Sequence, residues 1–240
     1  VCEDGRPPRQ YSIPPTPDAP PQMDLRKFID QGVWIIDTVY RYLAYTGDYS
    51  ILDEPCGYYR FEKGIQKTDE ITTVLEHLVR ISRFLISNIN EKTNCLHALY
   101  GDWNDALDGM GVSSDGSKEF GTGVSVMATL QLYHNMTEMG EILAETDKKE
   151  ALPTAEVKKR LERGLTEYAL VRESAGRRIL HGWGDERSYL VGSSRDPDGK
   201  DRVGLTSYAF WVISGMYARD KSVREDILRA YQRLDSKYGL

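Results

Sequence analysis

The sequence predicts an all-α fold with long loops and a small irregular or hairpin insertion. After about residue 29, apolar residues recur with the period of an amphipathic helix in several segments, and the stretches between them are rich in glycine and aspartate. Residues 1–23 differ, because seven prolines fall within them. The chain of 240 residues therefore divides into a proline-rich arm, 1–23, and a helical region, 24–240.

The proline-rich arm is expected to be non-helical. Each proline fixes its own φ and biases the residue before it toward extended conformations. In isolation such a segment is a linker, whereas against a larger body it is an ordered lining loop. The sequence leaves both possibilities open.

Helical periodicity is clearest just after the arm. Val33, Ile36, Tyr40 and Leu43 share one face, and Gly47 is a suitable C-terminal cap. Similar stripes predict further helices that begin near Asp69, after the Gly-rich segment 101–123, after Pro153 and Thr154, near 207, and at Ser222, where Glu225 has the spacing of a capping box. Between 177 and 204 short apolar pieces alternate with glycines, which predicts the irregular or hairpin insertion.

Composition restricts the function. The chain has 31 basic and 37 acidic side chains and a net charge of -6, which argues against nucleic acid or an anionic membrane surface as a partner. Three cysteines without a C-x-x-C pair predict neither disulfides nor a zinc site and favour a reducing, cytoplasmic compartment. The four histidines are dispersed, so no metal site is predicted.

The densest group of chemically useful side chains comprises Asp102, Trp103, Asn104, Asp105 and Asp108. Glycosyl transfer needs an acid that protonates the departing oxygen, an aromatic platform for a sugar face and polar groups for its hydroxyls. A neighbouring carboxylate and burial against Trp103 would raise the pKa of such an acid. The same residues also suit a solvated turn, in which aspartate and asparagine cap the ends of helices.

A family resemblance rests on this segment and on three others. Gly101–Asp105, read as G-D-W-N-D, resembles the catalytic segment of the inverting phosphorylases of glycoside hydrolase family 94, which act on cellobiose, cellodextrins, chitobiose and β-1,2-oligoglucans. The other three segments lie in the same order as in the family, and the likeness covers about 24–240. They are Asp30–Trp34, the pair Tyr45–Asp48 and Ile51–Glu54, and Ser207–Gly215.

The resemblance implies the central part of an (α/α)6 barrel, without the family's N-terminal β-sandwich and C-terminal barrel segments. In such an enzyme inorganic phosphate attacks the anomeric carbon while an acid, here Asp105, protonates the glycosidic oxygen. Trp103 would line the sugar sites, Asp102 would lie at the same pocket, and Asn104 would offer its amide. Asp30 matches a carboxylate that holds the non-reducing-end sugar.

Other implied features are less direct. A family arginine corresponds loosely to Arg26, with Lys27 as the competitor, and Gln31 replaces the second aspartate of an Asp-Asp pair. The expected partners are a β-linked oligosaccharide and phosphate, without another cofactor, and a homodimer through regions outside the chain is left open. Two alternatives also remain: an inverting hydrolase of the same barrel class, with Glu186 as a candidate base about 6.5–9.5 Å from the acid, and a non-catalytic carbohydrate-binding helical segment.

Overall fold

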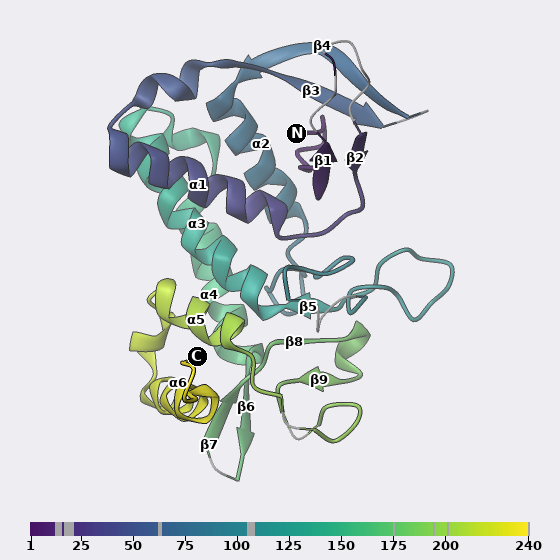
Figure 1. Cartoon of the computed structure of the whole chain (residues 1–240), viewed down its shortest axis with the longest axis vertical. Coiled ribbons are helices and arrows are strands. Elements are labelled where there is room, and N and C mark those ends of the chain that lie inside the picture. Colours follow the sequence, from purple (N-terminus) through teal and green to yellow (C-terminus); the bar gives the residue numbers. More distant parts are fainter. Residues whose placement is uncertain are drawn as a thin grey trace.

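A computed structural model describes residues 1–12, 16, 22–61, 64–104, 109–174, 176–193, 195–200 and 202–239. It is a mixed α/β structure in which helices account for 46% of the residues and strands for 20%. The prediction of an all-α fold, part of an (α/α)6 barrel, is therefore wrong. It includes several small antiparallel sheets that the helical periodicity did not indicate, with β3–β4 (Pro55–Phe61 and Ile65–Thr73) and β6–β7 (Leu170–Glu173 and Gly176–Ile179) at opposite ends of the molecule (Figure 1).

The helices lie near most of their predicted positions. Their starts are fixed by caps: Thr73 accepts from the N–H of Glu76, and Ser125 from that of Ala128. Gly47, in the left-handed region, ends the first helix as predicted. The helices are α1 (Gln31–Thr46), α2 (Val74–Ser87), α3 (Val126–Glu145), α4 (Thr154–Tyr168), α5 (Leu205–Ile213) and α6 (Lys221–Leu234), with short 3-10 turns at Tyr49–Asp53, Lys149–Ala151, Asp185–Arg187 and Met216–Arg219.

Two predicted helix starts were wrong. The second helix begins at Val74 rather than near Asp69, because residues 65–73 pair as a strand with 55–61. The last helix is capped by Asp220, whose Oδ1 accepts from the N–H of Ser222 at 2.8 Å, so Ser222 lies inside the first turn. The capping box expected there is not the cap that forms.

The described residues also form four antiparallel sheets. β1 (Gln10–Ser12) pairs with β2 (Gln22–Asp24), so the described part of the proline-rich arm forms a small ribbon. The remaining sheets are β3–β4, β6–β7 and the three-stranded order β5-β8-β9. Their strands are β3 (Pro55–Phe61), β4 (Ile65–Thr73), β5 (Val124–Ser125), β6 (Leu170–Glu173), β7 (Gly176–Ile179), β8 (Gly182–Trp183) and β9 (Leu190–Val191).

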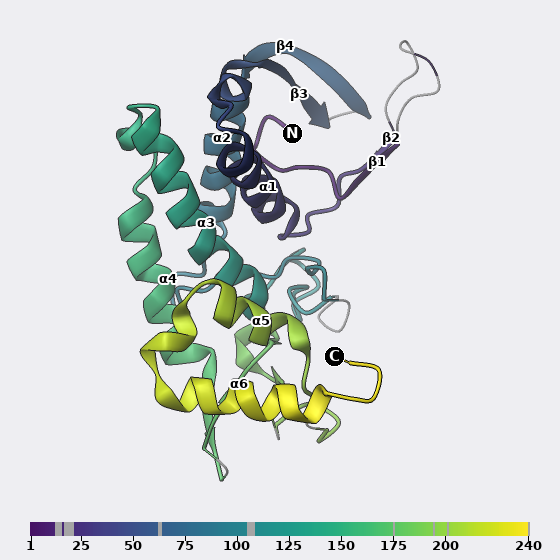
Figure 2. The same cartoon turned by 60° about the vertical axis from the view of Figure 1, so that its left-hand side comes forward.

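α3 is the central element of the packing. It contacts α1, α4 and α5, and side chains along most of its length are buried. Figure 2 shows α3 and α4 side by side, with α1 and α2 at one end of the pair and α5 and α6 at the other. Among the described residues, no helix combines the length and apolar character that crossing a bilayer requires.

Candidate active site

A short antiparallel pairing brings the predicted site residues together. Phe28 pairs with Leu99, and the N–H of Ile29 donates to the carbonyl of Gly101 at 3.1 Å. The segment that leads into α1 therefore runs beside the segment that leads into residues 101–104. Two regions about 70 residues apart in the sequence thus meet at the N-terminal end of α1.

Asp30 lies buried at that end of α1, with 4% of its surface exposed. Its Oδ1 accepts from Nε2 of Gln31 at 2.7 Å, and its Oδ2 from Nε1 of Trp34 at 3.4 Å. Burial raises the pKa of Asp30, and hydrogen bonds from its own backbone, from the Trp34 side chain and from the Trp103 backbone partly offset the rise. Gln31 thus supplies a hydrogen-bond donor to Asp30 and adds no negative charge beside it.

Asp102 is also buried, with 3% exposed, but its surroundings are different. Its Oδ1 accepts the N–H of Asn104 at 2.7 Å, and its Oδ2 accepts the hydroxyl of Ser125. Ser125 is the N-cap of α3, so Asp102 ties the loop to the start of that helix, where the helix dipole favours negative charge. These contacts suit a residue that holds the loop in place, and the predicted sugar contact of Asp102 stays a prediction.

Trp103 and Asn104 occupy contrasting positions on the same loop. Trp103 is 69% exposed, so much of its surface is accessible to a ligand. Asn104 is half-buried, and its Nδ2 donates to Oγ1 of Thr206 at 3.4 Å, which links the loop to the first turn of α5. The loop therefore contacts the N-terminal ends of α1, α3 and α5. Asp105 and Asp108, the predicted acid and its neighbour, lie outside the described residues.

Arg26 lies on the segment before Asp30, but its guanidinium is paired with Asp24. Its guanidinium makes a two-point contact with Asp24, at 3.0 Å from Nε and 2.6 Å from the terminal nitrogen. Arg9 lies over the ring of Phe28 at 4.2 Å and is 3.8 Å from Asp24. The alternative cation, Lys27, pairs with Glu119 at 3.1 Å.

The 3-10 turn at Asp185–Arg187 contributes a contact that the sequence did not indicate. The carboxylate of Asp185 accepts from the N–H and hydroxyl of both Ser114 and Thr122, at 2.8 to 3.1 Å. Hydrogen bonds from the Thr122 and Ser114 backbones hold the pKa of Asp185 well below its ordinary value. Glu186, the candidate base of a hydrolase, is exposed and lies 3.5 Å from Lys92.

Glycines in the loop allow close packing of the backbone. A Cβ on Gly111 would lie 2.2 Å from the carbonyl oxygen of Leu99, and one on Gly123 would lie 2.2 Å from that of Met110. The N–H of Thr122, between Gly121 and Gly123, already donates to Asp185. The Gly-rich segment is thus folded back against the chain that leads to Trp103.

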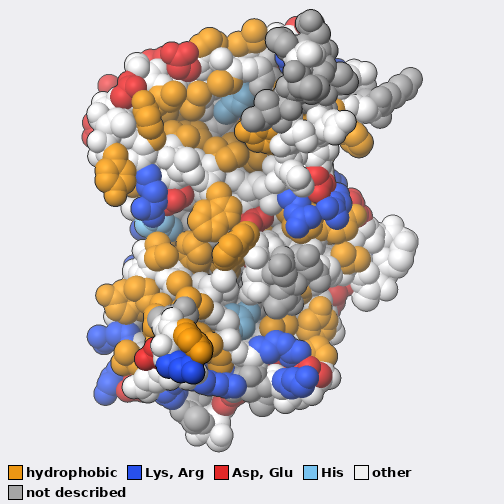
Figure 3. Space-filling view, viewed as in Figure 1, with side chains coloured by type: hydrophobic (Ala, Val, Ile, Leu, Met, Phe, Trp, Pro, Cys, Tyr) orange, Lys and Arg blue, Asp and Glu red, His pale blue; other side chains and the backbone are white. Residues whose placement is uncertain are grey.

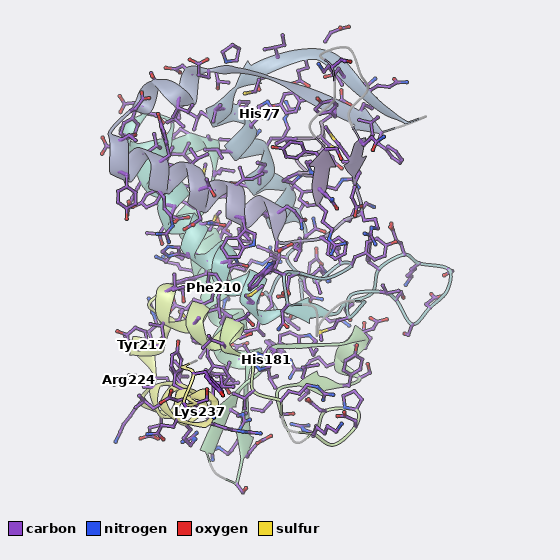
Figure 4. The ribbon with its side chains drawn as sticks, viewed as in Figure 1. His77, His181, Phe210, Tyr217, Arg224 and Lys237 are labelled. Atoms are coloured by element: carbon purple, nitrogen blue, oxygen red, sulfur yellow. The ribbon has the colours of Figure 1, made fainter. Side chains whose placement is uncertain are left out.

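His181 fixes the start of α5, which carries Thr206 and Phe210 (Figure 4). Its Nε2 accepts the N–H of Gly204 at 3.0 Å, so Nδ1 carries the proton and donates to Oγ of Ser207 at 3.0 Å. The dispersed histidine is therefore a buried structural group with both ring nitrogens in use. Its only signal in the sequence is its place beside the glycines of the insertion.

Comparisons with known proteins identify the family. Residues 21–240 match the Glycosyl hydrolase 94 superfamily, catalytic domain. Solabiose phosphorylase of Paenibacillus borealis is 30% identical over 226 residues, which cover 90% of this chain and 25% of that protein. The 3-O-beta-D-glucopyranosyl-beta-D-glucuronide phosphorylase of the same organism is 25% identical over 225 residues, covering 93% of this chain and 26% of its own length.

The match spans most of the chain, and the chain belongs to the glycosyl hydrolase 94 superfamily, within its catalytic domain. The family resemblance seen in the sequence is therefore confirmed. The chain spans about a quarter of the length of the two curated relatives.

Proposed function

We propose that this chain is part of an inverting glycoside phosphorylase that cleaves a β-linked disaccharide or oligoglucan with inorganic phosphate. The observation that carries the proposal is the meeting of Asp30, Trp34 and Trp103 at one site in a chain of this family. The names of two relatives, both phosphorylases, support phosphate rather than water as the nucleophile. We expect phosphate as co-substrate and no other cofactor.

In the proposed reaction a phosphate oxygen attacks the anomeric carbon from the face opposite the glycosidic bond. The carboxyl of Asp105 donates its proton to the glycosidic oxygen, which leaves as a sugar hydroxyl, and Asp105 is left as the carboxylate. One C–O bond forms and one breaks with inversion, so a β-linkage gives an α-configured sugar 1-phosphate. The role of Asp105 rests on the family motif.

The described residues suit the binding of the sugar. The exposed ring of Trp103 offers an apolar face, and the buried carboxyl of Asp30 can hydrogen-bond sugar hydroxyls in a dry environment. Hydrogen bonds of Asn104 and Asp102 attach the loop to the first turn of α5 and to the N-cap of α3. Arg26 would reach a ligand only by giving up part of its two-point contact with Asp24.

The test uses the full-length protein that contains this chain. It is incubated with β-linked disaccharides and oligosaccharides, with and without phosphate, and sugar 1-phosphate is measured. We expect product only with phosphate, and a loss of at least about 100-fold in rate for Asp105→Asn with binding retained. Asp115→Asn is the matched control, because Asp115 is an exposed turn residue that accepts from Ser117.

Each contrary result points to an alternative. Release of free sugar without phosphate would identify an inverting hydrolase, and sugar binding without any turnover would favour a non-catalytic carbohydrate-binding segment. Near-normal turnover by Asp105→Asn would remove Asp105 from the role of acid. The cytoplasmic location and a homodimer stay predictions.

A further inference from the structure

A cleft with one polar wall lies between α1, α3 and α5, and Trp34, which contacts Asp30, is one of its lining residues. Its volume is about 170 Å³. Trp34 and Phe210 form its apolar side, with ring centroids 5.8 Å apart. Figure 3 shows hydrophobic side chains gathered at the middle of this face, with acidic and basic side chains beside them. The cleft has room for several water molecules, each of which occupies about 30 Å³ in the liquid.

The polar wall is a stripe on one face of α3. Gln131, His134, Asn135 and Glu138 follow the spacing i, i+3, i+4 and i+7, which places them in one row. Three of them are almost completely buried: Gln131 is 4%, Asn135 2% and Glu138 2% exposed. Asp37 of α1 lies opposite this row and lines the same cleft.

This row holds more hydrogen-bond acceptors than donors. Within the described part of the chain, Oε1 of Gln131, Oδ1 of Asn135 and Oε1 of Glu138 have no hydrogen-bond partner. Nδ2 of Asn135 donates to Oε2 of Glu138 at 2.7 Å, so the amide of Asn135 is fixed with its oxygen unpaired. Buried acceptors without donors are costly, and a cation bound at Oε1 of Glu138 would satisfy one of them.

The distances fit a shared ion. Nε2 of His134 lies 3.3 Å from Oε1 of Glu138, yet the two atoms form no hydrogen bond. Ligand atoms of Asp37, His134 and Glu138 all lie within 4.8 Å of one another. In a tetrahedral zinc site with bonds of about 2.0–2.1 Å, neighbouring ligand atoms are about 3.3 Å apart. His134 and Glu138 thus already have this spacing, and the ligand atom of Asp37 needs a shift of about 1.5 Å or less to reach it.

We propose that Asp37, His134 and Glu138 bind a Zn²⁺ ion, with water from the cleft as the fourth ligand. An imidazole with two carboxylates suits zinc, whereas calcium and magnesium prefer oxygen ligands throughout. The ion would join α1 to α3. Its ligand Asp37 follows Asp30 by seven residues along α1, a distance of about 10 Å. The sequence predicted no metal site, because the four histidines are dispersed and Asp37 comes from another helix.

Two further residues orient the ligands. Asn135 holds one oxygen of Glu138 and leaves the other for the ion. Nε of Arg41 donates to Oδ2 of Asp37 at 2.8 Å, which leaves Oδ1 of Asp37 for the ion. The positive charge of Arg41 also opposes a cation, so we expect weaker binding than at a purely structural zinc site.

The test is metal binding by the full chain, with zinc alone as the probe. The protein is treated with EDTA, dialysed and titrated with Zn²⁺ by calorimetry, and Co²⁺ replaces zinc for an absorption spectrum that reports tetrahedral coordination. We expect one ion per chain and a higher Tm with zinc. His134→Gln and Glu138→Gln should each weaken binding at least about tenfold, and Asn135→Ala about 10–100-fold.

Glu141→Gln is the matched control, because Glu141 lies on the same helix but pairs with Tyr40. It should bind zinc as the native chain does. Equal affinity in the native chain and in His134→Gln and Glu138→Gln would overturn the proposal, as would no binding at all. Far-UV circular dichroism in EDTA establishes that each variant is folded. Asp37→Asn, on the other helix, provides an independent test if the α3 variants fail to fold.

Discussion

Replacing Asp185 with alanine should destabilise the chain through the loop that follows Trp103. The carboxylate accepts four hydrogen bonds, two from Ser114 and two from Thr122. The pair at Ser114 is exposed, so water can replace the carboxylate there. The pair at Thr122 is part-buried, and its N–H would lose its acceptor.

The magnitude follows from the part-buried pair. A hydrogen bond to a charged group contributes about 1.5–3 kcal/mol, and the lower end suits a half-buried site. The two bonds to Thr122 therefore predict a loss of about 3 kcal/mol in the free energy of unfolding for Asp185→Ala. Amide exchange should also become faster at Ser114 and Thr122, whose N–H groups lose their acceptors.

The assay is urea denaturation of the full chain, with hydrogen exchange of the two amides. Glu186→Gln is the matched control: Glu186 is the adjacent residue, its exposed carboxylate lies 3.5 Å from Lys92, and the substitution keeps its backbone N–H, which donates to Oγ1 of Thr122. The control should change the free energy by less than about 0.5 kcal/mol. If Asp185→Ala loses no more than the control does, the carboxylate does not hold the loop.

The pH dependence gives a second measure of the same contact. The pKa of Asp185 is lowered in the folded chain, so its contribution is complete above its ordinary pKa of 3.8 and is lost as the pH falls through the lower, folded value. The difference in stability between the native chain and Asp185→Asn should therefore be constant at pH 5 to 7. It should narrow below about pH 4. A difference that does not change down to pH 2 would contradict this account.

Three other changes have expected outcomes. Burial raises the pKa of Asp30 in the folded chain, so ionisation of Asp30 lowers stability as the pH rises above 3.8. The Tm of Asp30→Asn relative to that of the native chain should therefore increase between pH 3 and pH 7. A constant difference in Tm would contradict this. Trp103→Ala should raise the KM for oligosaccharide at least about tenfold, or 1.4 kcal/mol, with little change in Tm because the ring is exposed. Gly111→Ala should lower the free energy of unfolding by about 3 kcal/mol or more, measured by urea denaturation, because the new Cβ would meet the Leu99 backbone. Gly116→Ala is the control: its Cβ would enter open space, so the free energy of unfolding should not fall.

The helices were the predictable part of the fold because each buries an apolar stripe. The hairpin of β3 and β4 was not, since most of its side chains are exposed and its sequence lacks a buried alternation. Residues 65–73, with Asp69 at their centre, gave the pattern of a helix start. Strand pairing with 55–61 is a non-local contact, and propensity within one segment does not report it.

The sequence predicted residues of a candidate site but not the contacts that join them, and the roles of those residues stay predictions. The motif at 101–105 and the Asp30 segment were identified from sequence, and the chain's pairing of Phe28 with Leu99 brings them together. The hydrogen bonds between Asp185 and Thr122 join residues more than 60 positions apart, so no local sequence pattern could indicate them. The cluster of Asp37 with His134 and Glu138 was missed because Asp37 is distant in the sequence, and the local pair of His134 and Glu138 alone does not define a metal site.

The two buried aspartates of the site show how environment divides similar residues between roles. Asp102 meets the capped N-terminus of α3 and accepts hydrogen bonds from Ser125 and from the Asn104 backbone, so its negative charge is satisfied within the protein. Asp30 is buried too and accepts from the side chains of Gln31 and Trp34, but burial still raises its pKa. A carboxyl that is costly to ionise without a partner gains most from a ligand that supplies hydroxyl donors. This difference favours Asp30 as the sugar contact and Asp102 as the residue that holds the Trp103 loop on α3.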